Sequence, residues 1–491
     1  MNKHFLLALT LIIASLSSSF ADGYKIKIKV NGVSDTIVYL GNYYADKKYA
    51  TDTIRLDKNG VGTFKGDTAL KGGIYMVLFP SRGMNYFELL VDKNQNFSLE
   101  TDTANFIENM KVKGSKQNEA FYQFHNYMAE QSKKNMPLQK ELKALKDKPK
   151  KAEKVREKLI ANEKEVKAHW KQLAKEWKGT LFGAVIKAMI DPELPEIKVP
   201  ENIANKDSAK QIMQYLWVKD HFFDNIDLKD NRLIRTPFFT PKIDHFMTTV
   251  VVQHPDSIIK EGEKLIEAAR GAEDNFGYLV RYMFGYKDKS KLMGMDKVFV
   301  EISEKYYLSE DPDVSWPDSA FVEKIRERVM KEKPNLIGNQ APKLEKLETY
   351  EKQFVSLYDI KSDYTVIVFW EPNCGHCKKT IPKLYKSFKQ MKKDGLDVQV
   401  LAIYTQLERE PWEKFIEEKE IFDWINAYDK YYFTNFRNNY DIYSTPTIYL
   451  LNKEKKIIGK RLAVGQIEQM IYGMEGKEAP IHEKKDKKNH H

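Results

Sequence analysis

The only two cysteines of this 491-residue chain stand three positions apart, as Cys374-Gly375-His376-Cys377. They follow an apolar, β-branched run, 364–370, that is typical of a buried strand. The segment after them repeats its apolar residues with helical spacing, at Ile381, Leu384, Tyr385, Phe388 and Met391. The sequence therefore predicts an α/β unit in which the thiol pair lies between a strand and the first turn of a helix.

That placement gives the two thiols different chemistry. The first turn of a helix leaves backbone N–H groups without partners and carries partial positive charge. Both effects favour a thiolate at Cys374, and the thiolate is the reactive form of the thiol. Cys377 lies nearly one turn further along, so we expect it to be more buried. The pair suits attack on a disulfide by Cys374 and release by Cys377, and we expect His376 to lower the pKa of Cys374 further.

Other uses of this spacing fit less well. Structural zinc usually needs four ligands, and no second cysteine pair exists, although His482, His490 and His491 leave a histidine-completed site open. Covalent haem attachment needs histidine directly after the second cysteine, where Lys378 stands. An inert disulfide across so small a ring would remove little chain entropy. We therefore expect redox chemistry without a metal or dissociable cofactor.

A second motif lies further along the chain, where Thr445-Pro446 precedes the apolar run 447–451. Proline at the start of a strand is unusual unless it holds a special backbone. A cis Thr445–Pro446 bond opposite the thiols would present the Thr445 backbone to a substrate strand. An ordinary trans proline at a strand start is the competing interpretation.

Taken together, residues 336–474 resemble the thioredoxin superfamily, and most of all its secreted, TlpA-type thiol–disulfide oxidoreductases. The matching pieces are Phe369-Trp370, the C-G-H-C motif, Pro382, the strand 398–404, Thr445-Pro446 and the entry segment 338–342. The resemblance implies that Cys374 is the nucleophile and Cys377 the resolving thiol. It also implies that Trp370, Thr445 and Pro446 bind the substrate.

The chain departs from this family at two positions. The thioredoxin branch has a buried acid six residues before the first cysteine, where Val368 stands, and TlpA-like reductases often carry a glutamate at the position of Thr380. Either acid would help to move the proton of the buried thiol. Glu371 is a weak substitute, and the sequence favours a solvated turn residue there. The Gly375-His376 dipeptide is the one seen in protein disulfide isomerases, so reduction, oxidation and isomerisation all stay open.

The N-terminus has the pattern of a secretory signal. Lys3 and His4 precede an apolar stretch, 5–16, and Ser19-Phe20-Ala21 offers a cleavage site. No cysteine stands directly after that site, which excludes bacterial lipoprotein acylation. An uncleaved membrane anchor is the alternative to a cleaved signal. We predict a signal peptide over residues 1–21 and a periplasmic or secreted protein that does not span the membrane after cleavage.

The rest of the chain predicts a multidomain protein. An all-β sheet or sandwich is expected over 22–114, with a strand at 24–30 and turns at 57–60 and 92–94. A helical domain is expected over 115–335, the α/β thioredoxin-like domain over 336–474, and a disordered polar tail over 475–491. One helical stripe is expected to pack in the core: Leu159, Ile160, Val166, Trp170, Leu173 and Trp177.

Charge and cysteine count limit the partners. The net charge of +10 arises from 80 basic and 70 acidic residues that are interleaved, so no nucleic-acid partner is expected. Because the chain has no third cysteine, we expect protein dithiol or disulfide substrates and a separate, unidentified electron-exchange partner. The alternative is a non-catalytic envelope binding or assembly protein with a residual redox domain. A copper carrier is a weaker option.

Overall fold

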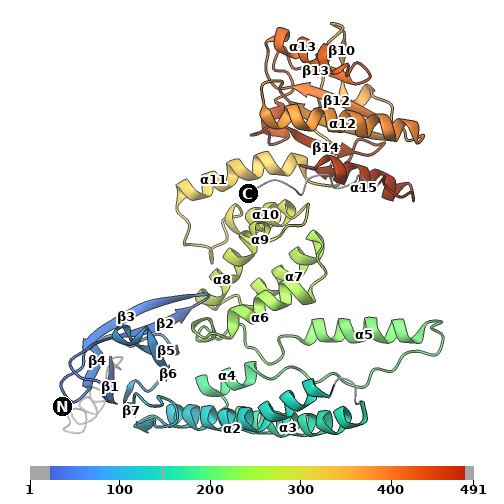
Figure 1. Cartoon of the computed structure of the whole chain (residues 1–491). Coiled ribbons are helices and arrows are strands. Elements are labelled where there is room, and N and C mark those ends of the chain that lie inside the picture. Colours follow the sequence, from blue (N-terminus) through green and yellow to red (C-terminus); the bar gives the residue numbers. More distant parts are fainter. Residues whose placement is uncertain (1–22, 146–148, 481–491) are drawn as a thin grey trace, which may run out of the picture. The chain divides into compact units, whose positions relative to one another are not determined.

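The computed structural model describes residues 23–145 and 149–480. These residues form two compact units, one comprising 23–252 with Glu261–Leu279 and the other Gln253–Lys260 with 280–480 (Figure 1). The signal peptide expected over 1–21 and the three tail histidines lie outside the described residues. Within the described part, no helix is both long enough and apolar enough to cross a membrane.

The first unit begins with a β-sandwich, as the sequence predicts. One sheet has the order β4-β1-β7-β8 and the other β3-β2-β5-β6. Their bounds are β1 Tyr24–Asn31, β2 Ile37–Tyr44, β3 Lys47–Arg55, β4 Val61–Gly66, β5 Gly73–Phe79, β6 Asn85–Val91, β7 Asn96–Asp102 and β8 Lys111–Lys113. In β1, alternate residues Ile26, Ile28 and Val30 are fully buried, which is the pattern of a strand with one face in a core.

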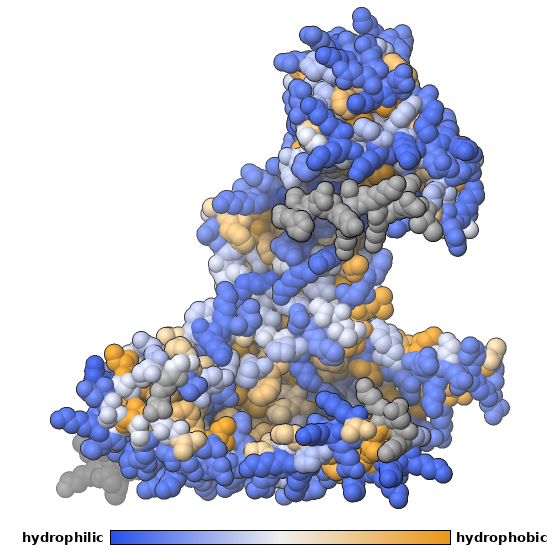
Figure 2. Space-filling model, viewed as in Figure 1, coloured by the Kyte–Doolittle hydropathy of each residue, from blue (hydrophilic) through white to orange (hydrophobic). Residues whose placement is uncertain are grey.

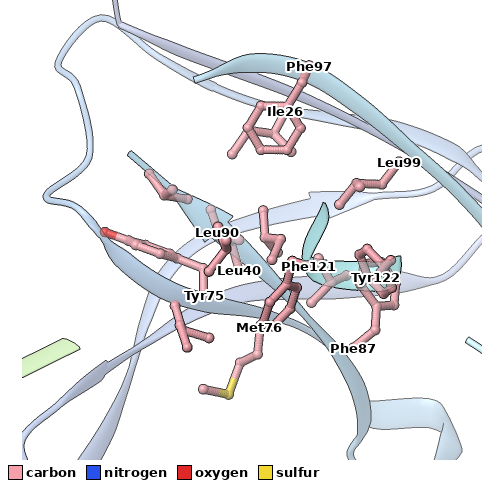
Figure 3. Packing of buried hydrophobic residues seen from close by; sticks show 14 of the residues in the cluster. Ile26, Leu40, Tyr75, Met76, Phe87, Leu90, Phe97, Leu99, Phe121 and Tyr122 are labelled. Carbon is pink, nitrogen blue, oxygen red and sulfur yellow. The ribbon is translucent and has the colours of Figure 1, made fainter. Parts of the chain in front are cut away.

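The two sheets and a helix enclose one apolar core (Figure 3). Ile26, Phe97 and Leu99 enter it from one sheet, and Met76 and Leu90 from the other. Phe121 and Tyr122 of α2 (Lys116–Ala144) pack against the same cluster. Buried Asn118 fixes this helix to β6, because its side chain binds both the N–H and the C=O of Leu90, at 2.7 and 2.8 Å.

Helices make up the rest of the first unit. They are α3 Pro149–Glu176, α4 Leu181–Ala188, α5 Lys206–His221, η2 Leu233–Arg235, α6 Phe239–His245, η3 Phe246–Val250, α7 Pro255–Ala268 and α8 Glu273–Phe284. The last two are shared, because residues 255–260 of α7 and 280–284 of α8 belong to the second unit. Trp170, Leu173 and Trp177 of the expected stripe pack against the sandwich core. Ile160 does not, since its side chain is 50% exposed.

The second unit contains a seven-stranded mixed sheet of order β10-β9-β13-β12-β11-β14-β15. The strands are β9 Leu347–Thr349, β10 Phe354–Val355, β11 Tyr364–Trp370, β12 Val398–Tyr404, β13 Ile425–Tyr428, β14 Thr447–Leu451 and β15 Ile457–Lys460. The helices are α9 Tyr286–Lys289, α10 Asp296–Ile302, η4 Ser303–Tyr307, α11 Ser319–Glu332, η5 Lys333–Asn335, η6 Leu357–Asp359, α12 Gly375–Lys393, α13 Arg409–Lys419, α14 Phe436–Asn439 and α15 Val464–Met474. The predicted strands 364–370 and 398–404 are confirmed.

Both faces of this sheet are covered, so β11 is buried along its whole length. Val366, Val368 and Trp370 point into one core, with residues of α12, α13 and α15. Ile367 and Phe369 point into the other, with residues of α14 and of the segments before β11. Parallel β11, β12 and β13 end at a common edge of the sheet, and the cysteine motif follows β11 at this edge.

Candidate functional site

The thiol pair occupies the start of α12. Cys374 is the N-cap residue, with an extended backbone, and the helix begins at Gly375. Cys374 is half-buried and Cys377 is fully buried, and both are free thiols. The apolar face of α12 fixes this orientation, because Ile381, Leu384, Phe388 and Met391 are all buried against the sheet. The sequence predicted this helix, its buried stripe and the unequal burial of the two thiols.

The surroundings of Cys374 favour its thiolate. Partial burial acts to raise the pKa of Cys374, but hydrogen bonds outweigh it and the net pKa is lowered. The donors are the backbone N–H groups of Cys377 and His376, the Cys377 thiol and the Thr445 hydroxyl. Two of these donors are backbone N–H groups of the first helical turn, as expected for a thiol at the N-terminus of a helix.

Cys377 has the opposite environment. Burial raises the pKa of Cys377 to about 12, and the neighbouring Cys374 raises it as well. At neutral pH, Cys377 is therefore a thiol that can donate a hydrogen bond to the Cys374 thiolate. The arrangement assigns the ionised, accessible sulfur to Cys374 and the protonated, protected one to Cys377.

The Thr445–Pro446 bond faces the thiols and is cis, as predicted. The Cys374 thiol donates to the carbonyl oxygen of Thr445 at 3.2 Å. Thr445 and Pro446 are both half-buried, so part of each is open to solvent beside the sulfur. The structure thus brings together two motifs that are 71 positions apart in the chain.

Glu371 differs from the solvated turn residue that the sequence favours. Its carboxylate is partly buried and accepts hydrogen bonds at 3.0 Å from the Thr445 hydroxyl and from the side-chain amide of Gln406. It therefore joins the loop before β14 to the loop after β12. The Gln406 contact was not predictable from local sequence, because Glu371 and Gln406 meet only through the parallel pairing of β11 and β12.

His376 and Trp370 differ from what the sequence predicts. The His376 side chain is exposed, and what acts on Cys374 is the backbone N–H of His376. The substrate-binding role expected for Trp370 is contradicted, since its side chain is 0% exposed and its ring packs 4.9 Å from that of Phe415. As the last residue of β11, Trp370 points into the core face of the sheet, away from solvent.

Beyond Gln406, the same sheet edge carries a small cavity of about 190 Å³. Its lining includes Leu407, from the loop after β12, and Tyr432, from the loop after β13. Neither residue was predicted from the sequence. The run Tyr431-Tyr432-Phe433 directly after a buried strand was the available signal, because consecutive aromatic residues are unusual in a solvated loop.

The segment that leads to Thr445 is also fixed by ion pairs to Asp441. Asp441 is 6% exposed and forms an ion pair with Arg461, and Arg328 of α11 lies 3.5 Å from the same carboxylate oxygen. Arg328 also pairs with buried Glu332 of its own helix. These contacts connect α11 to the segment that leads to Thr445.

No group of three or more metal-ligating side chains occurs in residues 23–145 and 149–480. The zinc site completed by tail histidines would require residues outside that part of the chain. The polar neighbours of Cys374 are the carbonyl and hydroxyl of Thr445, the Cys377 thiol and backbone N–H groups of the first helical turn.

Comparison with protein-family models divides the chain into three matches. Residues 362–457 match a thioredoxin-like family, residues 24–121 match the domain of unknown function DUF4369, and residues 138–333 match the domain of unknown function DUF5106. None of the curated proteins matches the chain.

Solved structures resemble mainly the C-terminal domain. A domain of a possible thiol–disulfide isomerase from Cytophaga hutchinsonii is 35% identical, covering 29% of this chain and 94% of that one, with a TM-score of 0.27. The thioredoxin domain of a thiol–disulfide oxidoreductase from Bacteroides vulgatus is 27% identical, covering 28% and 97%, with a TM-score of 0.25. A thioredoxin-like protein from Bacteroides caccae is 23% identical, covering 58% and 98%, with a TM-score of 0.42.

Proposed function

We propose that this protein is a thiol–disulfide oxidoreductase that acts on other proteins. The premise is that its C-terminal domain is thioredoxin-like and follows two domains of unknown function. The observation that carries the proposal is the opposite shift of the two thiols. The pKa of accessible Cys374 is lowered and that of buried Cys377 is raised to about 12. An inert disulfide, or a cysteine that only packs in a core, needs no difference in pKa between two thiols.

The proposed reaction has two balanced steps. The Cys374 thiolate attacks one sulfur of a substrate disulfide, a mixed disulfide forms, and the other substrate sulfur leaves as a thiolate that takes up a proton. Cys377 then loses its proton and attacks Cys374, which releases the second substrate thiol and leaves a Cys374–Cys377 disulfide. The substrate gains two electrons and the protein loses two. A dithiol protein must return them, because this chain has no further cysteine.

Run in reverse, the same steps form a disulfide in the substrate. Direction depends on the potential of the partner relative to this couple. We propose that the partner and substrates are envelope proteins, and that the chain acts in the periplasm or outside the cell after removal of residues 1–21. The pattern of Lys3, the apolar stretch 5–16 and the small residues near Ala21 supports this location.

Three variants of the full chain test the proposal. Reduction of insulin by the protein with a small dithiol should require Cys374 and should be abolished by Cys374→Ala. Cys377→Ala should instead accumulate mixed disulfides with substrate, visible on non-reducing gels. Phe422→Ala, an exposed site at the other edge of the sheet, is the matched control and should behave as wild type. Wild-type protein with no activity above the small dithiol alone would favour the non-catalytic binding role.

A further inference from the structure

We propose that the cavity beside Gln406 is a substrate subsite that takes one aromatic side chain of the polypeptide whose disulfide lies over Cys374. The proposal rests on the proposed function and deepens it, because it specifies the class of substrate. It joins three observations: a path of contacts from the thiol to the cavity, the size and lining of the cavity, and the exposed rings around it.

The path consists of contacts between neighbouring residues. Cys374 Sγ lies 3.2 Å from the Thr445 carbonyl oxygen. The Thr445 hydroxyl donates to Glu371 at 3.0 Å, and the other carboxylate oxygen of Glu371 accepts from Gln406 at 3.0 Å. Gln406 then lines the cavity. Since an extended chain advances about 3.3 Å per residue, a residue a few positions from the substrate cysteine can reach it.

The cavity is the size of a side chain. Its volume of about 190 Å³ is below the roughly 300–1,000 Å³ of sites for small-molecule ligands. Tyr404, Leu407 and Tyr432 supply apolar surface, and Arg437 lines the same space. A guanidinium group beside aromatic rings favours an aromatic occupant, because it stacks on ring faces.

The rings next to the cavity are exposed although they are apolar. Tyr431, Tyr432 and Phe433 have exposed fractions of 51%, 71% and 59%, and Leu407 has 42%. Such a cluster is typical of an interaction surface, and Leu407 and Tyr432 of this one line the same cavity as Gln406. An aromatic segment of a substrate polypeptide is therefore the occupant that fits.

The loop that carries these rings is built to hold its shape. Asp429 is 4% exposed and accepts hydrogen bonds from the backbone N–H groups of Phe433 and Thr434 and from the Thr434 hydroxyl, at 2.9, 2.9 and 2.7 Å. Tyr432 has a φ of +58°, which costs a non-glycine residue conformational energy. The fixed turn keeps the Tyr432 ring at the cavity instead of letting it pack into the core.

The test uses the full-length, prereduced protein and a series of short peptides. Each peptide carries one cysteine as a mixed disulfide with 2-mercaptoethanol, in a serine–glycine background, with one phenylalanine placed from one to five residues before or after the cysteine. The second-order rate constant for stoichiometric disulfide exchange is measured for each. We expect one or two adjacent positions to raise the rate constant about fivefold over the peptide without phenylalanine.

Two variants locate the effect. Tyr432→Asn removes the ring but tolerates a positive φ, so the loop keeps its backbone, and it should remove the preference for phenylalanine. Leu407→Ser should weaken it. Phe422→Asn changes another exposed aromatic residue, 49% exposed, that lies before β13 rather than after it, and should retain the preference.

The outcomes are separable. Equal rate constants for every peptide, or a preference that survives Tyr432→Asn, would overturn the subsite while leaving the proposed exchange reaction intact. Failure of wild-type protein to react with any of the peptides would overturn the exchange reaction itself, and the subsite with it.

Discussion

The hydroxyl of Thr445 donates to the carboxylate of Glu371 at 3.0 Å, and the carbonyl oxygen of the same Thr445 accepts from the thiol of Cys374 at 3.2 Å. One residue thus contacts the reactive sulfur with its backbone and an acid with its side chain. The Thr445 hydroxyl is also among the groups that lower the pKa of Cys374. A single hydroxyl proton cannot serve both acceptors fully, so Glu371 and the thiolate compete for it.

Substitution of Glu371 should reveal that competition. Glu371→Ala removes one acceptor, which frees the Thr445 hydroxyl for the sulfur, and we expect the pKa of Cys374 to fall further. Glu371→Gln keeps a side-chain oxygen as acceptor and should leave the pKa nearer that of wild type. The rate of iodoacetamide alkylation against pH measures both. A pKa that rises in Glu371→Ala would show that the hydroxyl does not stabilise the thiolate.

The pH dependence of the wild-type protein follows from the two opposite shifts. The pKa of Cys374 is lowered, so its alkylation rate should rise with a midpoint below the free-thiol value of about 8.5. Cys377, with a pKa of about 12, should not react in that range. The lowered pKa also stabilises the reduced fold above about pH 8.5, and this stabilisation is lost as the pH falls through the folded pKa of Cys374. Cys374→Ala should lack both effects, and a midpoint at the free value would contradict the assignment.

Two substitutions of His376 separate its side chain from its backbone. His376→Pro removes the N–H that acts on Cys374 and is tolerated in a first helical turn, so the pKa of Cys374 should rise. His376→Ala retains the N–H and loses only the exposed imidazole, so the pKa should change little. Equal shifts of the Cys374 pKa in the two variants would show that the imidazole of His376, and not its N–H, acts on the thiol. The potential of the couple, measured by redox titration, should become more reducing in His376→Pro only, by about 30 mV for each tenfold change in the equilibrium constant.

Arg328 of α11 should raise the local stability of the loop that precedes Thr445. Its guanidinium lies 3.5 Å from the buried carboxylate of Asp441. Arg328→Ala removes a charged partner, so the amides of residues 440–445 should exchange with deuterium several-fold faster, equivalent to roughly 1 kcal/mol of local stability. Arg326→Ala, two positions away on an exposed face of the same helix, is the control. Unchanged exchange in Arg328→Ala would mean that Arg461 alone holds Asp441.

Much of the thioredoxin-like domain could be predicted from local patterns. The limits of β11 and β12, the buried stripe of α12 and the unequal burial of Cys374 and Cys377 depend on apolar periodicity and on the start of a helix. Those features need only neighbouring residues. The β-sandwich and the helical region were predictable for the same reason.

Tertiary structure decided what surrounds the thiols. Strand order places β14 on one side of β11 and β12 on the other, and only that order brings Thr445 and Gln406 to the two carboxylate oxygens of Glu371. The same order buries Trp370, which the family resemblance placed at the substrate. Periodicity fixes which residues share a face of one strand, whereas the neighbours of that face depend on pairings between segments far apart in the chain. The sequence by itself therefore determined the reactive pair, and the fold determined its partners and the cavity beside them.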